Sequence, residues 1–305
     1  MQDEYLWDKS GEPDVEIVRL EETLAQFRYR PVKRRVQIPY RLAAAAVVVL
    51  TLAASFFFWH RAPASGWVLT ANSGQSRTLA QGEWIDTKTN SQVRLHSPQI
   101  GEVEVDAGSR LRVIDRSERL ALDHGAIHAF IWAPPRTFVV NTPSAKTIDL
   151  GCRYTLRVAP DGSGILHVET GWVAFEWKRQ ESFIPAGASC RTKSGRGPGI
   201  PYFDDAPATL RSALSDFEER NDTKDLQVML TSARPQDALS VWHLLTRTHG
   251  AERIAVFRRL SELVAIPASV SETAIERGDP RAMDATWNAL ELGDTAWWRG
   301  WEHRW

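Results

Sequence analysis

The sequence of 305 residues has almost no net charge, two cysteines and a single long apolar run. A formal net charge of -1 gives no overall field that would attract nucleic acid, so binding to DNA or RNA would need a local basic patch. The hydrophobic content of 43% and the charged content of 25% are those of a folded protein and exclude global disorder. We expect a folded chain of several segments with no direct nucleic-acid partner.

Signatures of catalysis and of metal binding are also missing. There is no Ser-His-Asp order, no nucleophile elbow and no paired-carboxylate pattern, so we expect neither an enzyme nor a cofactor. His124 and His128 would lie about 13 Å apart on a strand, and no Cys, Asp or Glu set completes a metal site around them. Segment 193–199, KSGRGPG, lacks the spacing and context of a phosphate-binding loop, and we interpret it as a flexible exit from the preceding strands.

The one long apolar run covers residues 42–59, LAAAAVVVLTLAASFFFW, and contains no charge. As a helix it would extend roughly 27 Å, close to the ~30 Å thickness of a bilayer's hydrocarbon core. We expect a transmembrane helix here, rather than a cleaved signal peptide or a buried core helix. Basic residues are concentrated before the run, so the positive-inside rule places residues 1–41 in the cytoplasm and the rest of the chain outside. These residues are Arg28, Arg30, Lys33, Arg34, Arg35 and Arg41.

The N-terminal segment contains one expected helix, which opens with Pro13 and the acidic residues Asp14 and Glu16. Apolar residues then recur at spacings of three and four and form one stripe about three turns long. A helix this short is marginal alone, so the stripe would lie on the inner leaflet or dock on a partner, unless the helix merely continues toward the membrane. The docking candidates are Ile17, Leu20, Leu24 and Phe27.

Between Gly66 and about Thr192, apolar residues alternate with polar ones, and glycines separate the alternating stretches. Val103 and Val105 are one such pair, and Leu120 and Leu122 are another. Short alternating stretches with frequent turn signals are typical of many half-buried strands. They predict an all-β domain, which could be a sandwich, barrel, roll or solenoid.

Four stretches of this region occur in the following order along the chain: GAIHAFI, RTFVVNTPSAKTIDLGCRYTLRV, ILHVETGWVAFEW and IPAGASCRT. Together they resemble the FecR family of periplasmic regulatory domains, whose pattern runs Gly-x-Val, Phe-x-Val-x-Thr-Pro, Leu-Gly-Thr-x-Phe, Val-x-Gly-x-Val and Ala-Gly. The matching positions are Phe138, Val140, Thr142, Pro143, Leu150, Gly151, Tyr154, Val168, Gly171, Val173, Ala186 and Gly187.

The resemblance implies a function. FecR-like domains lie outside the inner membrane on a single-span anchor and help to pass a signal to a cytoplasmic sigma factor of the extracytoplasmic-function type. The chain departs from the pattern at Cys152, where the family has Thr, and its first 41 residues lack the Trp-rich helical module associated with sigma-factor binding.

The pattern residues are interpreted as fold residues. Pro143 cannot donate to a strand ladder, so Thr142-Pro143 would end a strand, and Gly151 and Gly171 would supply turn or bulge geometry. Phe138, Leu150, Tyr154 and Gly187 complete this set of fold residues.

Cys152 and Cys190 are the only cysteines, and both fall in the expected exported domain. An oxidising compartment permits a disulfide between them, which we expect; two buried thiols are the alternative.

From about Asp205 onward the apolar period returns to that of a helix. Three helical segments are expected at residues 237–248, 251–264 and 279–292, and Asp279 and Pro280 supply the N-cap and the first position of the last one. Five of the 13 tryptophans fall at or after Trp287. They would fill the seams of a small bundle, or they would dock on the β domain, on a partner or at a membrane interface.

The expected fold class is a multi-domain, membrane-anchored α+β protein. Its parts are a cytosolic segment with one helix (1–41), a transmembrane helix (42–59), a FecR-like β domain (60–204) and a C-terminal helical bundle (205–305). We expect a single-pass inner-membrane regulator with a cytoplasmic N-terminus and a periplasmic C-terminus, which relays a signal to a sigma factor. An outer-membrane or periplasmic protein is a further expected partner. The alternative is an envelope scaffold or a polymer- or protein-binding module without a transcriptional role.

Overall fold

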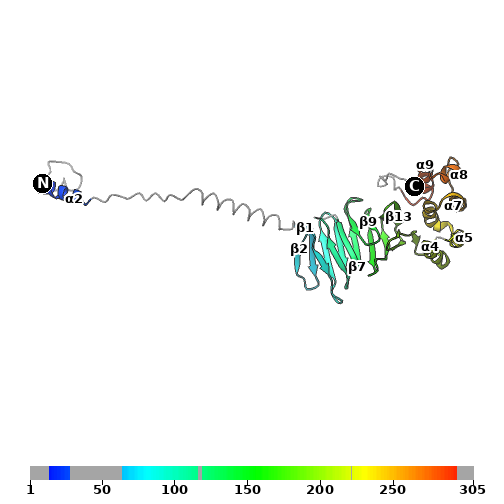
Figure 1. Ribbon diagram of the computed structural model, residues 1–305, viewed down its shortest axis with the longest axis horizontal. Coiled ribbons are helices and arrows are strands. Elements are labelled where there is room, and N and C mark those ends of the chain that lie inside the picture. Colours follow the sequence, from blue (N-terminus) through cyan, green and yellow to red (C-terminus); the bar gives the residue numbers. More distant parts are fainter. Residues whose placement is uncertain (1–13, 28–63, 116–118, 221, 294–305) are drawn as a thin grey trace. The chain divides into compact units, whose positions relative to one another are not determined.

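The computed structural model describes residues 14–27, 64–115, 119–220 and 222–293 (Figure 1). The chain divides into two compact units, residues 1–61 and residues 62–305. In the first unit, helix α2 (Val15–Ala25) begins after Asp14, whose side chain accepts a hydrogen bond from the Glu16 backbone N–H at 3.0 Å. The helix predicted from the apolar stripe is therefore present.

The second unit opens with strands. In the described residues they are β1 (Ala64–Ala71), β2 (Ser76–Ala80), β3 (Trp84–Asp86), β4 (Val93–Ser97), β5 (Gly101–Val105), β6 (Arg110–Val113), β7 (Arg119–Ile131), β8 (Val139–Asn141), β9 (Lys146–Asp149), β10 (Arg153–Val158), β11 (Gly164–Thr170), β12 (Trp172–Trp177), β13 (Gln180–Pro185), β14 (Ala188–Lys193), β15 (Gly197–Pro198) and β16 (Tyr202–Phe203).

Two sheets share the long strand β7. The first sheet has the order β2-β1-β4-β5-β7-β10-β11-β14, and β15 and β16 both pair with β14. The second has the order β3-β6-β7-β8-β9-β12-β13. Strand β7 pairs with β6 up to His124 and with β5 and β10 from Gly125 onward, so it passes from one sheet to the other. The β7–β8 pairing is parallel, and the other pairings among the described strands are antiparallel.

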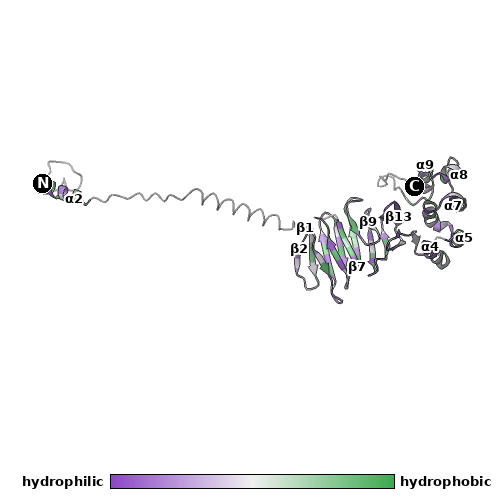
Figure 2. Cartoon of the chain, viewed as in Figure 1, coloured by the Kyte–Doolittle hydropathy of each residue, from purple (hydrophilic) through white to green (hydrophobic). Residues whose placement is uncertain are grey.

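Alternation along the strands produces the core. In β5, Val103 and Val105 are fully buried while Glu102 and Glu104 are only half-buried, and Figure 2 shows hydrophobic and hydrophilic residues alternating along the strands. The inward side chains of the two sheets meet, and the Trp67 and Phe138 rings lie 5.8 Å apart between centroids. Each such buried side chain contributes roughly 1.5–3 kcal/mol of transfer free energy.

Helices follow the last strand. They are α4 (Ala208–Arg220), α5 (Thr223–Ser232), the short 3-10 helix η1 (Pro235–Asp237), α6 (Ala238–Arg247), α7 (Gly250–Leu263), α8 (Glu272–Glu276) and α9 (Pro280–Asn288). Asp279 caps α9 by accepting from the Arg281 and Ala282 backbone N–H groups, which confirms the predicted N-cap and first-turn proline. Trp172 of β12 and Phe183 of β13 both contact Trp287 of α9, so strands and helices share one core.

The expected membrane-anchored fold class is wrong for the part of the chain that the structure describes. Residues 42–59 lie outside the described residues, and in the part that the structure describes no helix is long and apolar enough to cross a membrane. The longest described helix, α7, has 14 residues, whereas a span needs about 20. The described chain is an α+β protein, and the single-pass inner-membrane localisation is not supported. The predicted domain boundaries stay predictions, and residues 62–305 form one compact unit.

Candidate functional site

Helix α2 exposes most of the apolar stripe predicted for docking. Leu20 is 64% exposed, Leu24 is 56% exposed and Phe27, in the turn after the helix, is 76% exposed, while Ile17 is half-buried. No residue of the helix is buried. Since successive residues of a helix are rotated by about 100°, these four side chains lie on one face of the segment.

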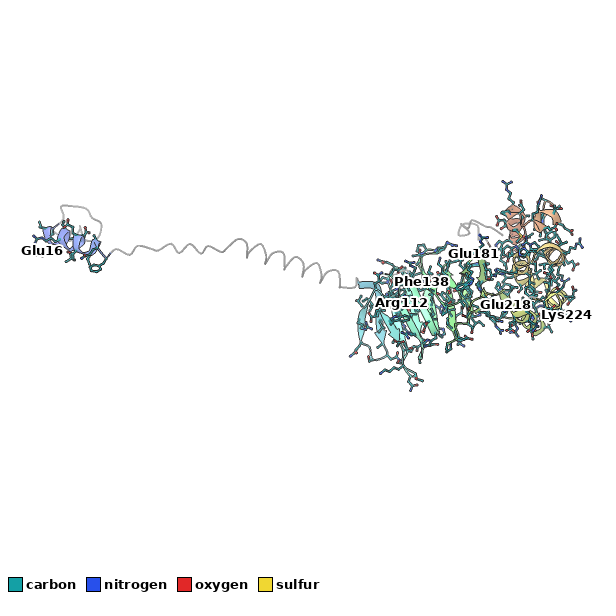
Figure 3. The ribbon with its side chains drawn as sticks, in the orientation of Figure 1. Glu16, Arg112, Phe138, Glu181, Glu218 and Lys224 are labelled. Atoms are coloured by element: carbon teal, nitrogen blue, oxygen red, sulfur yellow. The ribbon has the colours of Figure 1, made fainter. Side chains whose placement is uncertain are left out.

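The family-pattern residues lie in the β sheets and their turns. Phe138, Leu150 and Tyr154 are buried in the core, and Figure 3 shows Phe138 among the strands. Thr142 Oγ1 accepts a hydrogen bond from the Ala145 backbone N–H at 3.0 Å, which closes the turn that contains Pro143 between β8 and β9.

The three pattern glycines occupy turns at positive φ, namely Gly151 at 88°, Gly171 at 76° and Gly187 at 74°. They differ in their surroundings. A Cβ on Gly171 would lie 2.0 Å from the Gly151 carbonyl oxygen, whereas a Cβ on Gly187 would meet nothing within 4 Å.

The predicted disulfide is not formed, because both thiols are free and buried. Cys190 on β14 pairs with Leu166 on β11, and Leu166 pairs in turn with Leu156 on β10. Cys152 precedes Leu156 by four residues. This register places the two cysteines about 16 Å apart, from roughly 3.3 Å per residue along a strand and about 4.8 Å between strands. A disulfide needs a Cα separation of about 4.4–6.8 Å, so a bridge would require the sheet to rearrange.

Cys152 instead contacts a buried acid that sequence reasoning missed. Asp149 is 1% exposed; its Oδ1 accepts from the Gly151 backbone N–H at 2.7 Å, and its Oδ2 accepts from the Cys152 thiol. Burial raises the pKa of Asp149 to about 7, and it also raises the pKa of Cys152 and of Tyr154. An acid between the apolar residues Ile148 and Leu150, two residues before a glycine, was the available signal.

A buried histidine joins the helices to the second sheet. The Phe183 backbone N–H on β13 donates to His243 Nε2 at 3.0 Å, and His243 Nδ1 donates to the Leu239 carbonyl at 2.9 Å. This arrangement requires the neutral ring, and burial lowers the pKa of His243 to about 3. The rings of Trp242 and Trp287 pack edge-on against the histidine. Sequence reasoning missed this residue, because a histidine inside an apolar helix gives no sign of its acceptor role.

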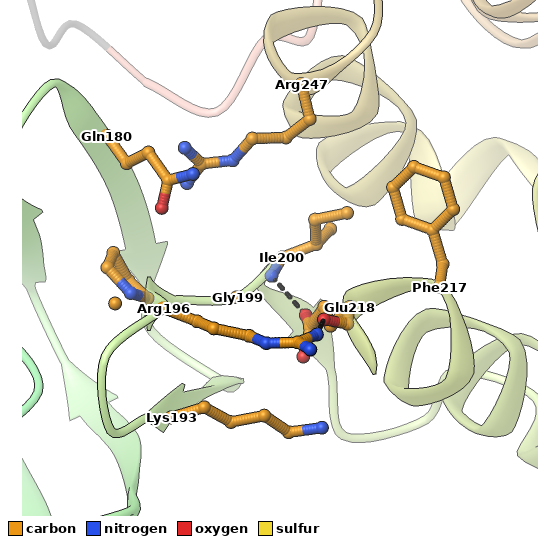
Figure 4. Close-up of a pocket in the computed structure, with 10 residues that line it drawn as sticks. Gln180, Lys193, Arg196, Gly199, Ile200, Phe217, Glu218 and Arg247 are labelled. Atoms are coloured by element: carbon orange, nitrogen blue, oxygen red, sulfur yellow. Dashed lines mark hydrogen bonds between the residues drawn. The ribbon is translucent and has the colours of Figure 1, made fainter. Parts of the chain in front are cut away.

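A cavity of about 280 Å³ lies where the β14–β15 turn faces α4 and α6 (Figure 4). Glu218 Oε1 accepts from the Ile200 backbone N–H at 2.6 Å, and Arg247 Nη2 donates to Ser182 Oγ at 2.9 Å. Burial raises the pKa of Glu218 and lowers the pKa of Arg247. Segment 193–199 is thus an ordered strand-turn-strand and not the flexible exit that we expected. The lining residues are Gln180, Lys193, Arg196, Gly197, Pro198, Gly199, Ile200, Phe217, Glu218 and Arg247.

The outer face of the first sheet carries an exposed aromatic pair. Phe130 and Trp132 are each 44% exposed, and their ring centroids lie 5.7 Å apart. The guanidinium of Arg153 lies over the Phe130 ring, 4.6 Å from its centroid. In the described residues, no group of three or more histidine, cysteine or acidic side chains is placed to hold a metal ion, around His124 and His128 or elsewhere.

Comparisons with known proteins add little. No protein-family model and no curated protein matches the chain. Two crystal structures described as "a putative anti-sigma factor" from Parabacteroides distasonis ATCC 8503 resemble it with a TM-score of 0.35 each, at 17% and 16% identity. The first covers 43% of this chain and the second 48%, and the chain spans 63% and 74% of their respective lengths. A likeness at this TM-score establishes neither the fold nor the function of the chain.

Proposed function

We propose that this chain is a regulator that binds a sigma factor of the extracytoplasmic-function type and acts by binding rather than by catalysis. The FecR-like sequence pattern of the β region supports a regulatory role. The observation that carries the proposal is the exposed apolar stripe of helix α2, because it offers a surface for a partner helix or groove.

Helix α2 has the properties of a helix that becomes stable when it binds a partner. An isolated helix of 11 residues is marginal in water, and α2 buries none of its residues. A groove that accepted Leu20, Leu24 and Phe27 would remove apolar surface from water and stabilise the helix at the same time. The interface of one short helix is small, so the affinity would be modest and the contact reversible.

The double substitution Leu20→Ala and Leu24→Ala tests the docking surface. Each lost side chain removes apolar area worth ~25 cal/mol per Å², so we expect binding to weaken by tenfold or more. Co-purification of the candidate sigma factor and transcription of a sigma-dependent reporter would be measured at equal levels of the chain. Arg19→Ala with Glu22→Ala is the matched control, because these residues lie on the opposite face and alanine keeps the helix propensity.

Unchanged co-purification and unchanged reporter output in the Leu20/Leu24 variant would contradict this proposal. The second candidate, a polymer- or protein-binding module without a transcriptional role, is favoured by the exposed pair Phe130 and Trp132. If Phe130→Ala with Trp132→Ala abolished retention of the chain on its partner while the α2 variant did not, the second candidate would replace the first.

A further inference from the structure

The wall of the cavity between the β14–β15 turn and the helices has an excess of positive charge. Three of its lining side chains are cationic, Lys193, Arg196 and Arg247, and Glu218 is the one carboxyl among them. Figure 4 shows Arg247 extending from α6 toward Gln180, and Lys193 and Arg196 extending from the β14–β15 turn. The charges come from both the strands and the helices.

The three cations differ in how their charge is balanced. Lys193 Nζ pairs with Glu219 Oε1 at 2.7 Å. Arg196 donates to the backbone carbonyls of Glu218 and Glu219, and Arg247 donates to the Glu181 carbonyl and to Ser182 Oγ, all of which are neutral acceptors. In the described part of the chain, neither guanidinium has a carboxylate oxygen within the 4.0 Å of an ion pair.

The Glu218 carboxyl makes no ion pair with either guanidinium, because it is hydrogen-bonded to the backbone instead. Glu218 Oε1 is engaged by the Ile200 backbone N–H at 2.6 Å (Figure 4). The backbone of Gly199 packs closely on the same carboxyl, so that a Cβ there would lie 2.1 Å from Oε1. A cation in a poorly solvated site is costly unless a counter-charge and hydrogen-bond acceptors are close to it. The cavity therefore leaves the largely desolvated guanidinium of Arg247 without a directly contacting anionic partner, because the Glu218 and Glu181 carboxylates act on its charge only from beyond ion-pair distance. Arg196 is exposed to solvent and adds positive charge at the rim.

We propose that this cavity binds a small anion with a carboxylate or phosphate group, and that Arg247 is its principal contact. Guanidinium groups present paired N–H donors that match the oxygens of these anions. The volume of about 280 Å³ lies at the lower end of ligand sites, which fits a small organic acid or inorganic phosphate rather than a polymer. Because both strands and helices supply the wall, the bound anion stabilises the contact between them.

Thermal unfolding and calorimetric titration of the full chain test this site. Sodium phosphate, acetate and citrate would each be compared with sodium chloride at equal ionic strength. We expect at least one oxyanion to raise Tm in a saturable way and to bind with one-to-one stoichiometry. Arg247→Gln should weaken that binding by about tenfold or more, since it removes the charge-assisted hydrogen bonds. Arg157→Gln, which removes a positive charge from an exposed position on β10, should change the Kd by less than about twofold.

Absence of saturable binding by all three oxyanions would overturn the proposal, and so would equal weakening by Arg247→Gln and Arg157→Gln. If Arg247→Gln does not fold, Lys193→Gln with Arg196→Gln serves instead, and unchanged affinity in that variant would overturn the proposal as well. The result is separable from the proposed sigma-factor binding, because the Leu20/Leu24 variant leaves the cavity intact.

Discussion

At the scale of single residues, the structure places one ionisable group where it must stay neutral. His243 is fully buried, accepts from β13 and donates within α6, so it cannot gain a proton without losing the contact to Phe183. Burial lowers the pKa of His243 to about 3, whereas an unfolded chain has a histidine pKa near 6.5. The stability that this residue contributes is therefore present above about pH 6.5 and is lost as the pH falls toward 3.

This pH dependence can be isolated by substitution. Between pH 7 and pH 5 the wild-type chain should lose about 2 kcal/mol more unfolding free energy than His243→Gln, because glutamine does not titrate. Urea denaturation at both pH values measures the difference between the two proteins. The pH-induced change in unfolding free energy must be compared between the two proteins, because other groups titrate in the same range. Burial raises the pKa of Asp149 to about 7, so the stability contributed by Asp149 is lost as the pH rises, which is opposite to His243. Identical pH slopes for the two proteins would show that His243 binds protons equally in the folded and unfolded states, and would contradict the lowered pKa.

At the scale of elements, turns between consecutive strands contain two glycines of the FecR-like sequence pattern. The β11–β12 turn at Gly171 and the β13–β14 turn at Gly187 have almost the same φ, 76° and 74°, but only the first lies against another backbone. Gly187→Ala should cost about 1 kcal/mol, the usual penalty for a side chain in this conformation. Gly171→Ala should cost at least ~2 kcal/mol more, because the Gly151 carbonyl must also move. Chemical denaturation of both variants measures the gap, and equal losses would contradict the contact.

At the scale of the whole molecule, strands and helices are parts of one core. Trp287 of α9 contacts Trp172 and Phe183 of the strands, and the buried cluster is continuous across both. Residues 62–305 should therefore unfold in a single calorimetric transition. A chain that ends at Asp204 should bind the dye ANS and lose cooperative unfolding, because it exposes the face of β12 and β13 that the helices cover. A truncated chain with an unchanged Tm would instead establish the β region as an independent domain with its boundary at residue 204.

Local patterns predicted the elements well. The alternation around Val103 and Val105 predicted β5, and the Asp279-Pro280 pair predicted the start of α9, since both depend on residues next to one another in the chain. Helices α4 and α5 were missed, although in α4 Leu210, Leu214 and Phe217 recur with helical spacing and are buried, so here the signal was present in the sequence. The candidate site was predicted in part: the α2 stripe came from periodicity, whereas the cavity was not anticipated.

The sequence alone determined the properties that depend on near neighbours: where strands alternate, where α2 and α9 begin, and that Leu20 and Leu24 share a helix face. Tertiary structure decided every property that depends on which distant segments meet. Sheet register separated Cys152 from Cys190, docking of α6 on β13 made His243 an acceptor, and the packing of the β14–β15 turn on α4 and α6 placed Arg247 beside a cavity. The physical reason is that burial and electrostatic environment are set by contacts between residues far apart in the chain, and spacing along the sequence carries no information about those contacts.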